Sequence, residues 1–192
     1  QINREREVVH RTVNFSITPA LGQIGIEGYL LLCSNEHFVG ICGMPSDLDG
    51  ELETLLDRTK KVIGEIYSSP VIVFEHGPKS ACYKGGGCLE HARLHIVPTN
   101  VDVRRFLLKK DFVLEEVEGF DRLRQIYSRE ESSYLFLEQN GKRHVVETKV
   151  PLISQYLRRV IAFGLGRENW DWRKYPDRKT FEKTLQTLRG KF

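Results

Sequence analysis

The sequence from residue 87 to residue 98 reads Gly87-Cys88-Leu89-Glu90-His91-Ala92-Arg93-Leu94-His95-Ile96-Val97-Pro98. Polar and apolar residues alternate through its second half, and this period of two is typical of a β-strand, which Pro98 would end. Because successive side chains of a strand point to opposite faces, we expect His91, Arg93 and His95 to share one face. The stretch therefore predicts three strong hydrogen-bonding groups in a row.

Two further groups precede this strand and indicate an anion-binding pocket. Glu75-His76-Gly77 follows the apolar run at 71–74, and a glycine-rich loop ends at residue 88. Glycines allow close backbone approach and their N–H groups can cradle a phosphate, while histidine and arginine add donors and positive charge. We therefore expect phosphate to be bound by Glu75, His76, Gly77, Gly86, Gly87 and Cys88. The alternative is that the histidines are solvated surface residues and the glycines only form turns.

The first half of the chain is predicted to combine short strands with one long helix. Apolar residues recur at helical spacing from Ser46 to Ile66, and Pro45 and Ser46 are helix start signals. Short apolar or alternating runs, separated by turn residues, predict strands at 13–17, 29–33, 38–42, 71–74 and 89–97.

The second half offers more helices and one hairpin. Asn140-Gly141 between two alternating runs, 134–138 and 142–148, is a strong hairpin signal. Helices are predicted at 103–110, 120–127, 152–163 and 178–188. The pattern favours an α+β fold, divided into a core at 10–100 and a C-terminal α/β extension at 101–192 that packs on the core.

Composition narrows the class of protein. The chain has 192 residues, 40% of them hydrophobic, and a formal net charge of +3, which is too small to argue for nucleic acid by itself. No apolar run approaches the length of a membrane span, and Arg4-Glu5-Arg6-Glu7 is no signal-peptide core. We expect a cytoplasmic protein without a membrane partner. The four sparse cysteines are expected to be mostly reduced.

Several of these motifs, in order, resemble the histidine-triad (HIT) superfamily. The segment from Gly28 to His37, Gly-Tyr-Leu-Leu-Leu-Cys-Ser-Asn-Glu-His, is similar to the family's Gly-His-x-Leu-Val-x-Pro-Lys-x-His. The strand with His91, Arg93 and His95 is similar to the family's His-x-His-x-His strand. The resemblance covers roughly residues 10 to 100. It implies a HIT-like antiparallel sheet with flanking helices, nucleotide or nucleotide-like ligands such as nucleotide sugars, and a homodimer. We expect no cofactor.

The resemblance also implies roles for the triad positions. In active members the middle histidine attacks the α-phosphorus and the outer two orient it; His91 and His95 match the outer positions, and Arg93 occupies the nucleophile's place. A guanidinium lacks the lone pair that covalent attack requires, but it can grip a phosphate with two hydrogen bonds. Tyr29 replaces a family histidine, and with His37 it is a candidate substrate-binding residue.

The predicted function is therefore HIT-like binding of nucleotide phosphates. Whether the chain is an enzyme stays open: it is expected to be either a hydrolase or transferase of nucleotidyl compounds that forms no nucleotidyl-histidine, or a catalytically inactive nucleotide binder. Takeover of the nucleophile's role by His91 or His95 is a weaker alternative. Cys82, Cys88, His91 and His95 are zinc-compatible types but lack a tight Cys-x2-Cys pair, so no metal is predicted.

The C-terminal half adds an aromatic motif. Arg158-Arg159 followed by Trp170-Asp171-Trp172-Arg173 loosely resembles the C-terminal region of the CwfJ-like RNA-processing family, which makes an RNA-processing accessory module a further alternative. Trp170 and Trp172 either anchor the extension on the sheet or form a stacking wall for a base, with the arginines as phosphate partners.

Overall fold

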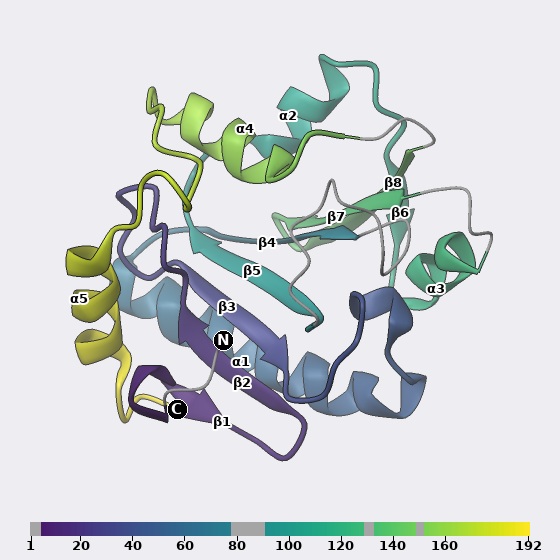
Figure 1. The fold of residues 1–192 in the computed structure, drawn as a ribbon. Coiled ribbons are helices and arrows are strands. Elements are labelled where there is room, and N and C mark those ends of the chain that lie inside the picture. Colours follow the sequence, from purple (N-terminus) through teal and green to yellow (C-terminus); the bar gives the residue numbers. More distant parts are fainter. Residues whose placement is uncertain (1–4, 78–90, 129–132, 149–151) are drawn as a thin grey trace.

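The computed structural model describes residues 5–77, 91–128, 133–148 and 152–192, and these build one antiparallel sheet flanked by helices (Figure 1). The strand order is β1-β2-β3-β5-β4-β7-β8-β6, and each neighbouring pair is antiparallel. The strands are β1 (His10–Arg11), β2 (Phe15–Pro19), β3 (Leu30–Ser34), β4 (Val71–Gly77), β5 (Arg93–Pro98), β6 (Glu115–Val117), β7 (Ser133–Gln139) and β8 (Lys142–Thr148).

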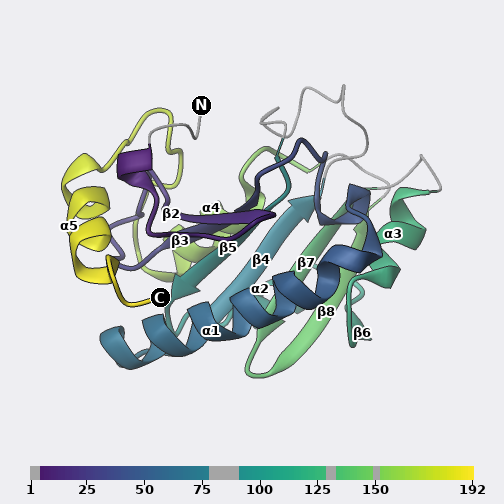
Figure 2. The ribbon, with the colours of Figure 1, turned by 90° about the horizontal axis from the view of Figure 1, so that it is seen from below.

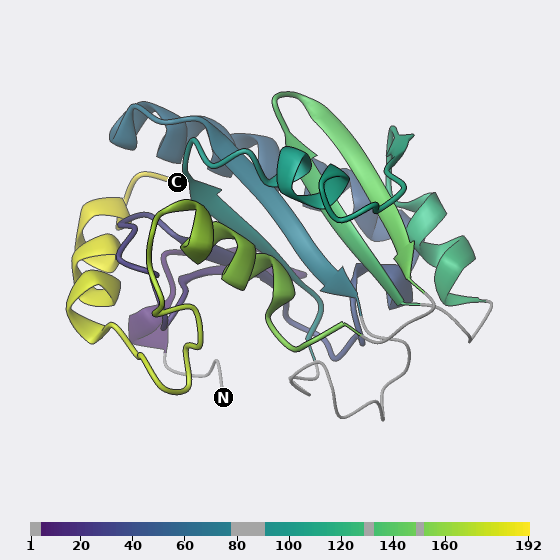
Figure 3. The same cartoon turned by 90° about the horizontal axis from the view of Figure 1, so that it is seen from above.

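The helices cover both faces of this sheet. They are the short 3-10 helices η1 (Glu5–Glu7), η2 (Ile41–Gly43) and η3 (Ser46–Leu48), and the α-helices α1 (Asp49–Tyr67), α2 (Val103–Leu108), α3 (Asp121–Tyr127), α4 (Tyr156–Gly164) and α5 (Arg178–Leu188). Helix α1 runs along one face (Figure 2), whereas α2 and α4 lie on the opposite face (Figure 3). Helix α5 packs against β2, at the side of the molecule where β1, β2 and β3 lie.

Each face of the sheet has its own apolar core. On β5, Leu94 and Ile96 belong to the cluster under α1, whereas Val97 belongs to the cluster under α2 and α4. Arg93 and His95 therefore share the second face with Val97, as the alternation of a strand requires. The prediction of an α+β fold around an antiparallel sheet is confirmed.

Two local predictions are confirmed by backbone geometry. The helix expected from Ser46 is present as η3 followed by the 19-residue α1, whose buried stripe is Leu52, Leu55, Leu56, Thr59 and Ile63. The hairpin of β7 and β8 turns at Asn140 and Gly141, with φ angles of 54° and 73°. Positive φ at both central residues is what a two-residue type I′ turn needs.

The strand predicted at 38–42 is wrong. Residues 41–43 instead form the short helix η2, with Ile41 and Cys42 buried. Side chains take the place of a partner strand: the Glu75 carboxylate accepts the Ile41 N–H at 3.0 Å, and the Tyr134 hydroxyl accepts the Cys42 N–H at 3.3 Å. Because these side chains bond the backbone, the segment needs no strand pairing. The two-residue β1 and the three-residue β6 were not predicted.

The sheet continues across the boundary predicted near residue 100. Strand β7 pairs with β4 over five residues, and β8 and β6 follow beyond it. Strands from before and after residue 100 therefore share one set of hydrogen bonds and one pair of cores. No helix of the described ranges combines the length and apolar character needed to cross a bilayer.

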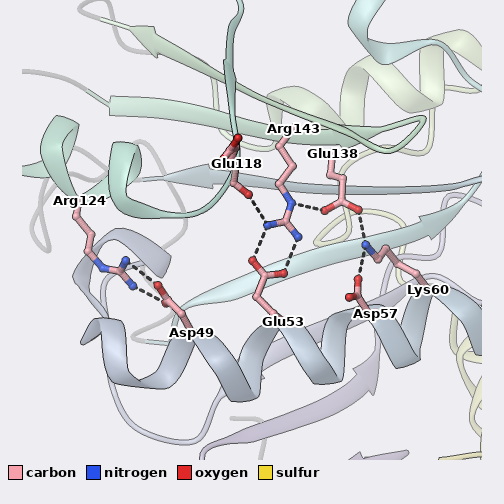
Figure 4. A network of polar contacts seen from close by, with 8 residues as sticks. All are labelled: Asp49, Glu53, Asp57, Lys60, Glu118, Arg124, Glu138 and Arg143. Atoms are coloured by element: carbon pink, nitrogen blue, oxygen red, sulfur yellow. Dashed lines mark hydrogen bonds and ion pairs between the residues drawn. The ribbon is translucent and has the colours of Figure 1, made fainter.

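A network of ion pairs joins α1 to the β7–β8 hairpin (Figure 4). The Arg143 guanidinium donates to both carboxylate oxygens of Glu53 on α1, to Glu138 on β7, and to the backbone carbonyl of Glu118. Lys60 of α1 also binds Glu138, whose side chain is only 9% exposed. A bidentate, partly buried arginine of this kind contributes more than an exposed pair, because losing it leaves carboxylates with fewer partners away from water.

We expect Arg143→Met to lower the free energy of unfolding by about 2 kcal/mol or more, because Glu53 and Glu138 lose donors in a partly desolvated site. Lys142→Met is the matched control: its pair with Glu116 is 3.0 Å long, but both side chains are about 60% exposed, so the loss should stay below roughly 0.5 kcal/mol. Urea unfolding of both variants measures the difference, and equal losses would contradict the role given to Arg143.

Candidate functional site

A cavity of about 240 Å³ opens on the α4 side of the sheet, next to α5. Arg93 and His95 of β5 form part of its floor, together with residues of β2 and β3. Its other walls come from the loop after β2, from η1, and from the C-terminal part of the chain, which contributes Arg158, Trp172, Arg178 and Phe181.

Arg93 and His95 lie side by side because β5 is paired on both edges. On β3, Cys33 is opposite Arg93 and Leu31 is opposite His95, while β4 places Phe74 opposite His95. Burial lowers the pKa of Arg93 from its ordinary value. A guanidinium remains charged at neutral pH even so, because its ordinary pKa lies far above neutrality. The predicted pair is thus brought to one cavity, in which Arg93 is a permanent cation.

His95 is held as a neutral ring. The Tyr29 hydroxyl lies 2.7 Å from its Nδ1, and the ring stacks on Phe74 at 4.6 Å with an interplanar angle of 3°. Burial lowers the pKa of His95 well below its usual value, and the charges of Arg158 and Arg93 lower it further. Burial also raises the pKa of Tyr29, so the phenol keeps its proton.

The tautomer of His95 follows from these contacts. We assign the protonated phenol as the donor to Nδ1, which puts the proton of the neutral ring on Nε2. The Nε2–H of His95 can donate a hydrogen bond to a ligand oxygen. It has no lone pair there with which to attack phosphorus. The structure also shows that Tyr29, a predicted substrate-binding residue, is fully buried and is committed to His95.

His91 is held elsewhere. It precedes β5, and its Nδ1 lies 2.9 Å from the carbonyl oxygen of Ser34 and 3.2 Å from that of Glu36. Carbonyls only accept, so Nδ1 carries a proton and, in the neutral ring, Nε2 has the lone pair. The ring lies 4.3 Å from the ring of His37. The structure therefore brings the predicted residues His37 and His91 together, and neither is among the side chains that line the cavity in the described ranges.

The predicted phosphate ligands of β4 divide between the two faces. Glu75 points to the face of α1, where its carboxylate accepts hydrogen bonds from the Ile41 N–H and the Tyr134 hydroxyl. His76, one residue on, lies on the face of His95, and burial lowers its pKa. Gly77 meets the ring of Tyr134, where an added Cβ would come within 2.1 Å of ring atoms. Glu75 and Gly77 thus serve packing beneath the sheet.

The predicted phosphate ligands Gly86, Gly87 and Cys88, and the zinc-compatible Cys82, lie outside the described residues.

Of the two tryptophans, Trp172 reaches the cavity. A Cβ at Gly22 would lie 2.5 Å from the Cβ of Trp172, so only glycine lets the two segments come this close. The guanidinium carbon of Arg173 lies 4.9 Å from the centre of the Trp172 ring. Trp170 instead packs against the apolar core under α4, and Arg159 lies over its ring.

Sequence reasoning missed the wall formed by α5 and η1. Arg178 and Phe181 line the cavity from α5, and Arg178 pairs with Glu7 at 2.9 Å. The only local signal was an amphipathic helix, and nothing in its pattern points to residues 85 positions earlier in the chain. Among the lining residues that the structure describes, Arg93, Arg158 and Arg178 outnumber the single carboxylate of Glu7, so the cavity favours an anion.

Comparison with known proteins adds no relative: no protein-family model matches the chain, and no curated protein matches it.

We expect the His95 ring to stay neutral, as the Nε2–H tautomer, from pH 8 down to pH 6, because burial and two nearby guanidinium groups oppose its protonation. Nitrogen NMR of ¹⁵N-histidine-labelled protein reports both properties. In Tyr29→Phe the donor to Nδ1 is lost, and the tautomer preference should weaken. A cationic His95 ring at pH 6.5 in the unaltered chain would contradict this assignment.

We expect Glu75 to make stability fall with rising pH. Burial raises the pKa of Glu75 from a usual value near 4.5 to about 7. The hydrogen bonds from Tyr134 and Ile41 act in the opposite direction but are outweighed. The folded state thus favours the protonated carboxyl, so the stabilisation is complete below pH 4.5 and is lost as the pH rises through 7.

Glu75→Gln mimics the protonated form and isolates this effect. Tyr134 and Cys42 do not ionise in the same range, since the pKa of each is raised. Relative to the unaltered chain, the variant should gain about 3 kcal/mol of unfolding free energy between pH 4.5 and pH 8, measured by urea unfolding. A difference that does not change with pH would show that Glu75 ionises normally.

Proposed function

We propose that this protein binds a nucleotide or nucleotide-like phosphorylated small molecule in the cavity on β5, and that it forms no covalent bond to it. The observation that carries the proposal is the placement of Arg93 and His95 side by side in a cavity whose walls add Arg158, Arg178 and Trp172.

Arg93 is the proposed phosphate ligand. Its planar guanidinium can donate two parallel hydrogen bonds to phosphate oxygens, and partial burial strengthens such charge-assisted bonds. The Nε2–H of His95 supplies a third donor from the same face of β5. Because this donor is neutral and the guanidinium is permanently charged, phosphate binding should depend little on protein protonation near neutral pH.

Trp172 is the proposed stacking surface for the base. Aromatic and aliphatic side chains supply a large part of the cavity lining, including Trp172, Phe181 and Leu31. A planar base gains about 1–3 kcal/mol by stacking on an aromatic ring. The volume of about 240 Å³ is slightly below the roughly 300–1,000 Å³ of typical ligand pockets, which favours a compact ligand such as a nucleoside monophosphate.

Covalent nucleotidyl transfer is not part of the proposal. Arg93 has no free lone pair, and Nε2 of His95 carries a proton. His91 has a lone pair on Nε2 when neutral, but its ring is paired with His37 away from the cavity lining. These arrangements support a binding protein over an enzyme that forms a nucleotidyl-histidine.

The fold supports a HIT-like assignment of residues 10–100 as part of the same proposal. Strand β3, helix α1, strand β4 and strand β5 follow one another in the order implied by the resemblance, and β5 pairs with both strands. The departure lies in the triad: its middle position, occupied by Arg93, suits ionic binding of phosphate.

We expect Arg93→Ala to weaken binding of AMP at least 30-fold, because about 2 kcal/mol or more is lost with a charged hydrogen-bond donor. Titration calorimetry with AMP measures this. Binding of adenosine, which lacks the phosphate, should be weak and should change little. Arg105→Ala is the matched control, since it removes the same charge from an exposed position on α2 and should leave AMP affinity unchanged.

Two outcomes would count against the proposal: AMP and other nucleoside phosphates failing to bind, or Arg93→Ala binding them as tightly as the unaltered chain. Phosphorus NMR with nucleoside diphosphates and nucleotide sugars tests turnover in the same samples. Product formation that is lost in Arg93→Ala would replace the binding protein with a hydrolase that uses direct attack by water.

A further inference from the structure

Arg158 occupies an unusual position for a charged residue. It lies on α4, is only 4% exposed, and its guanidinium contacts three separate parts of the chain. Nε donates to the carbonyl of Trp170 at 3.0 Å, and Nη2 donates to the carbonyl of Gly22 at 2.7 Å. Its central carbon lies 5.1 Å from the centre of the Tyr29 ring. A buried charge with this many partners is costly to remove and specific in its geometry.

We propose that Arg158 is a positioning residue of the cavity: it orients His95 through Tyr29, and it fixes the wall formed by Gly22 and Trp172. This inference rests on the proposed function, because it assigns Arg158 a task in the same site. It also changes the expected role of this arginine, since two of its donors are committed to backbone carbonyls and its face is committed to Tyr29.

The first half of the task is the orientation of His95. A cation over an aromatic face is attracted to the ring, so Arg158 restrains the plane of Tyr29. That ring is fully buried and bears the hydroxyl that lies 2.7 Å from Nδ1 of His95. Phe74 stacks on the imidazole ring of His95 and covers one face of that ring. Arg158 therefore helps to direct the Nε2–H of His95.

The charge of Arg158 acts on the same ring. After burial, Arg158 contributes the largest opposition to protonation of His95, followed by Arg93 and His76, and together they lower the pKa of His95. Tyr29 remains a proton donor, since burial raises its pKa. A neutral His95 thus depends in part on a side chain 63 positions later in the sequence.

The second half of the task is the wall. One guanidinium bonds the carbonyl of Gly22, in the loop after β2, and the carbonyl of Trp170, two residues before Trp172. The loop at Gly22 lies so close to α4 that a Cβ added to Gly22 would lie 2.8 Å from Nη2 of Arg158. Arg158 thereby ties the segment bearing the stacking ring to the loop that forms the neighbouring part of the cavity.

The test compares Arg158→Met and Arg158→Lys with Arg159→Met. Arg159 is the next residue on α4, is exposed, and also lies over an aromatic ring, that of Trp170, so its variant controls for charge and for cation–π contact. Nitrogen NMR of His95 in the ligand-free protein is the first readout. AMP affinity at several pH values is the second, and urea unfolding is the third.

We expect Arg158→Met to raise the pKa of His95 and to weaken its Nε2–H preference, because the charge and the restraint on Tyr29 are both lost. Arg158→Lys keeps the charge but not the forked geometry, so it should leave the ring neutral and still weaken the tautomer preference. AMP affinity should fall roughly tenfold in both variants, and in Arg158→Met it should become pH-dependent between pH 5 and 7. Arg159→Met should match the unaltered chain.

The outcomes separate this inference from the proposed function. Unchanged His95 resonances in a folded Arg158 variant would overturn the inference, even if AMP binds as proposed. Altered resonances in a protein that binds no nucleoside phosphate would uphold the positioning role of Arg158 and overturn the proposed function. If Arg158→Met does not fold, Arg158→Lys decides, because a purely structural role would lower stability without changing the tautomer of His95.

Discussion

The pairing of β5 on both edges is the constraint on which the rest of the site depends. A strand hydrogen-bonded to β3 and β4 cannot rotate or slip by one residue without exchanging its faces, so Leu94 and Ile96 keep Arg93 and His95 on the α4 side. The apolar core under α1 thus supplies the energy that holds a guanidinium and an imidazole in partial burial. Neither group would be stable there without the fixed register of the surrounding sheet.

Two buried tyrosines hydrogen-bond titratable side chains on opposite faces of the sheet. Tyr29 satisfies His95 on the α4 side, and Tyr134 satisfies Glu75 on the α1 side. Each phenol is fully buried, keeps its proton, and donates it to a titratable partner. The two bonds have different effects. The carboxylate of Glu75, held by Tyr134, also accepts the Ile41 N–H and so anchors the short helix η2. The bond from Tyr29 occupies Nδ1 of His95 and leaves Nε2 with the ring proton.

Local patterns were sufficient for much of the fold and for the centre of the site. Helix α1 and the Asn140-Gly141 turn depend on nearest neighbours in sequence, and the alternation around Arg93 predicted that Arg93 and His95 share a face. It did not predict that His91 lies apart from them, since β5 begins only at Arg93 and the His91 ring is held by the Ser34 and Glu36 carbonyls. The strand expected at 38–42 is absent because side chains of β4 and β7 bond the backbone of this segment, and no local pattern reveals those contacts. For the same reason the sequence placed Glu75 with His76 and did not connect α5 or η1 to the cavity: those contacts are tertiary and exist only after the sheet has formed.

The cavity walls come from segments that are far apart in the sequence. Its walls include η1 near the start of the described residues, β5 in the middle, and α5 near the end, where Arg178 reaches back to Glu7. Segments from both ends and from the middle of the described chain must therefore be folded together before the cavity can hold an occupant. A bound molecule would therefore stabilise the whole chain against global unfolding, by mass action, and would do little for a partly folded intermediate.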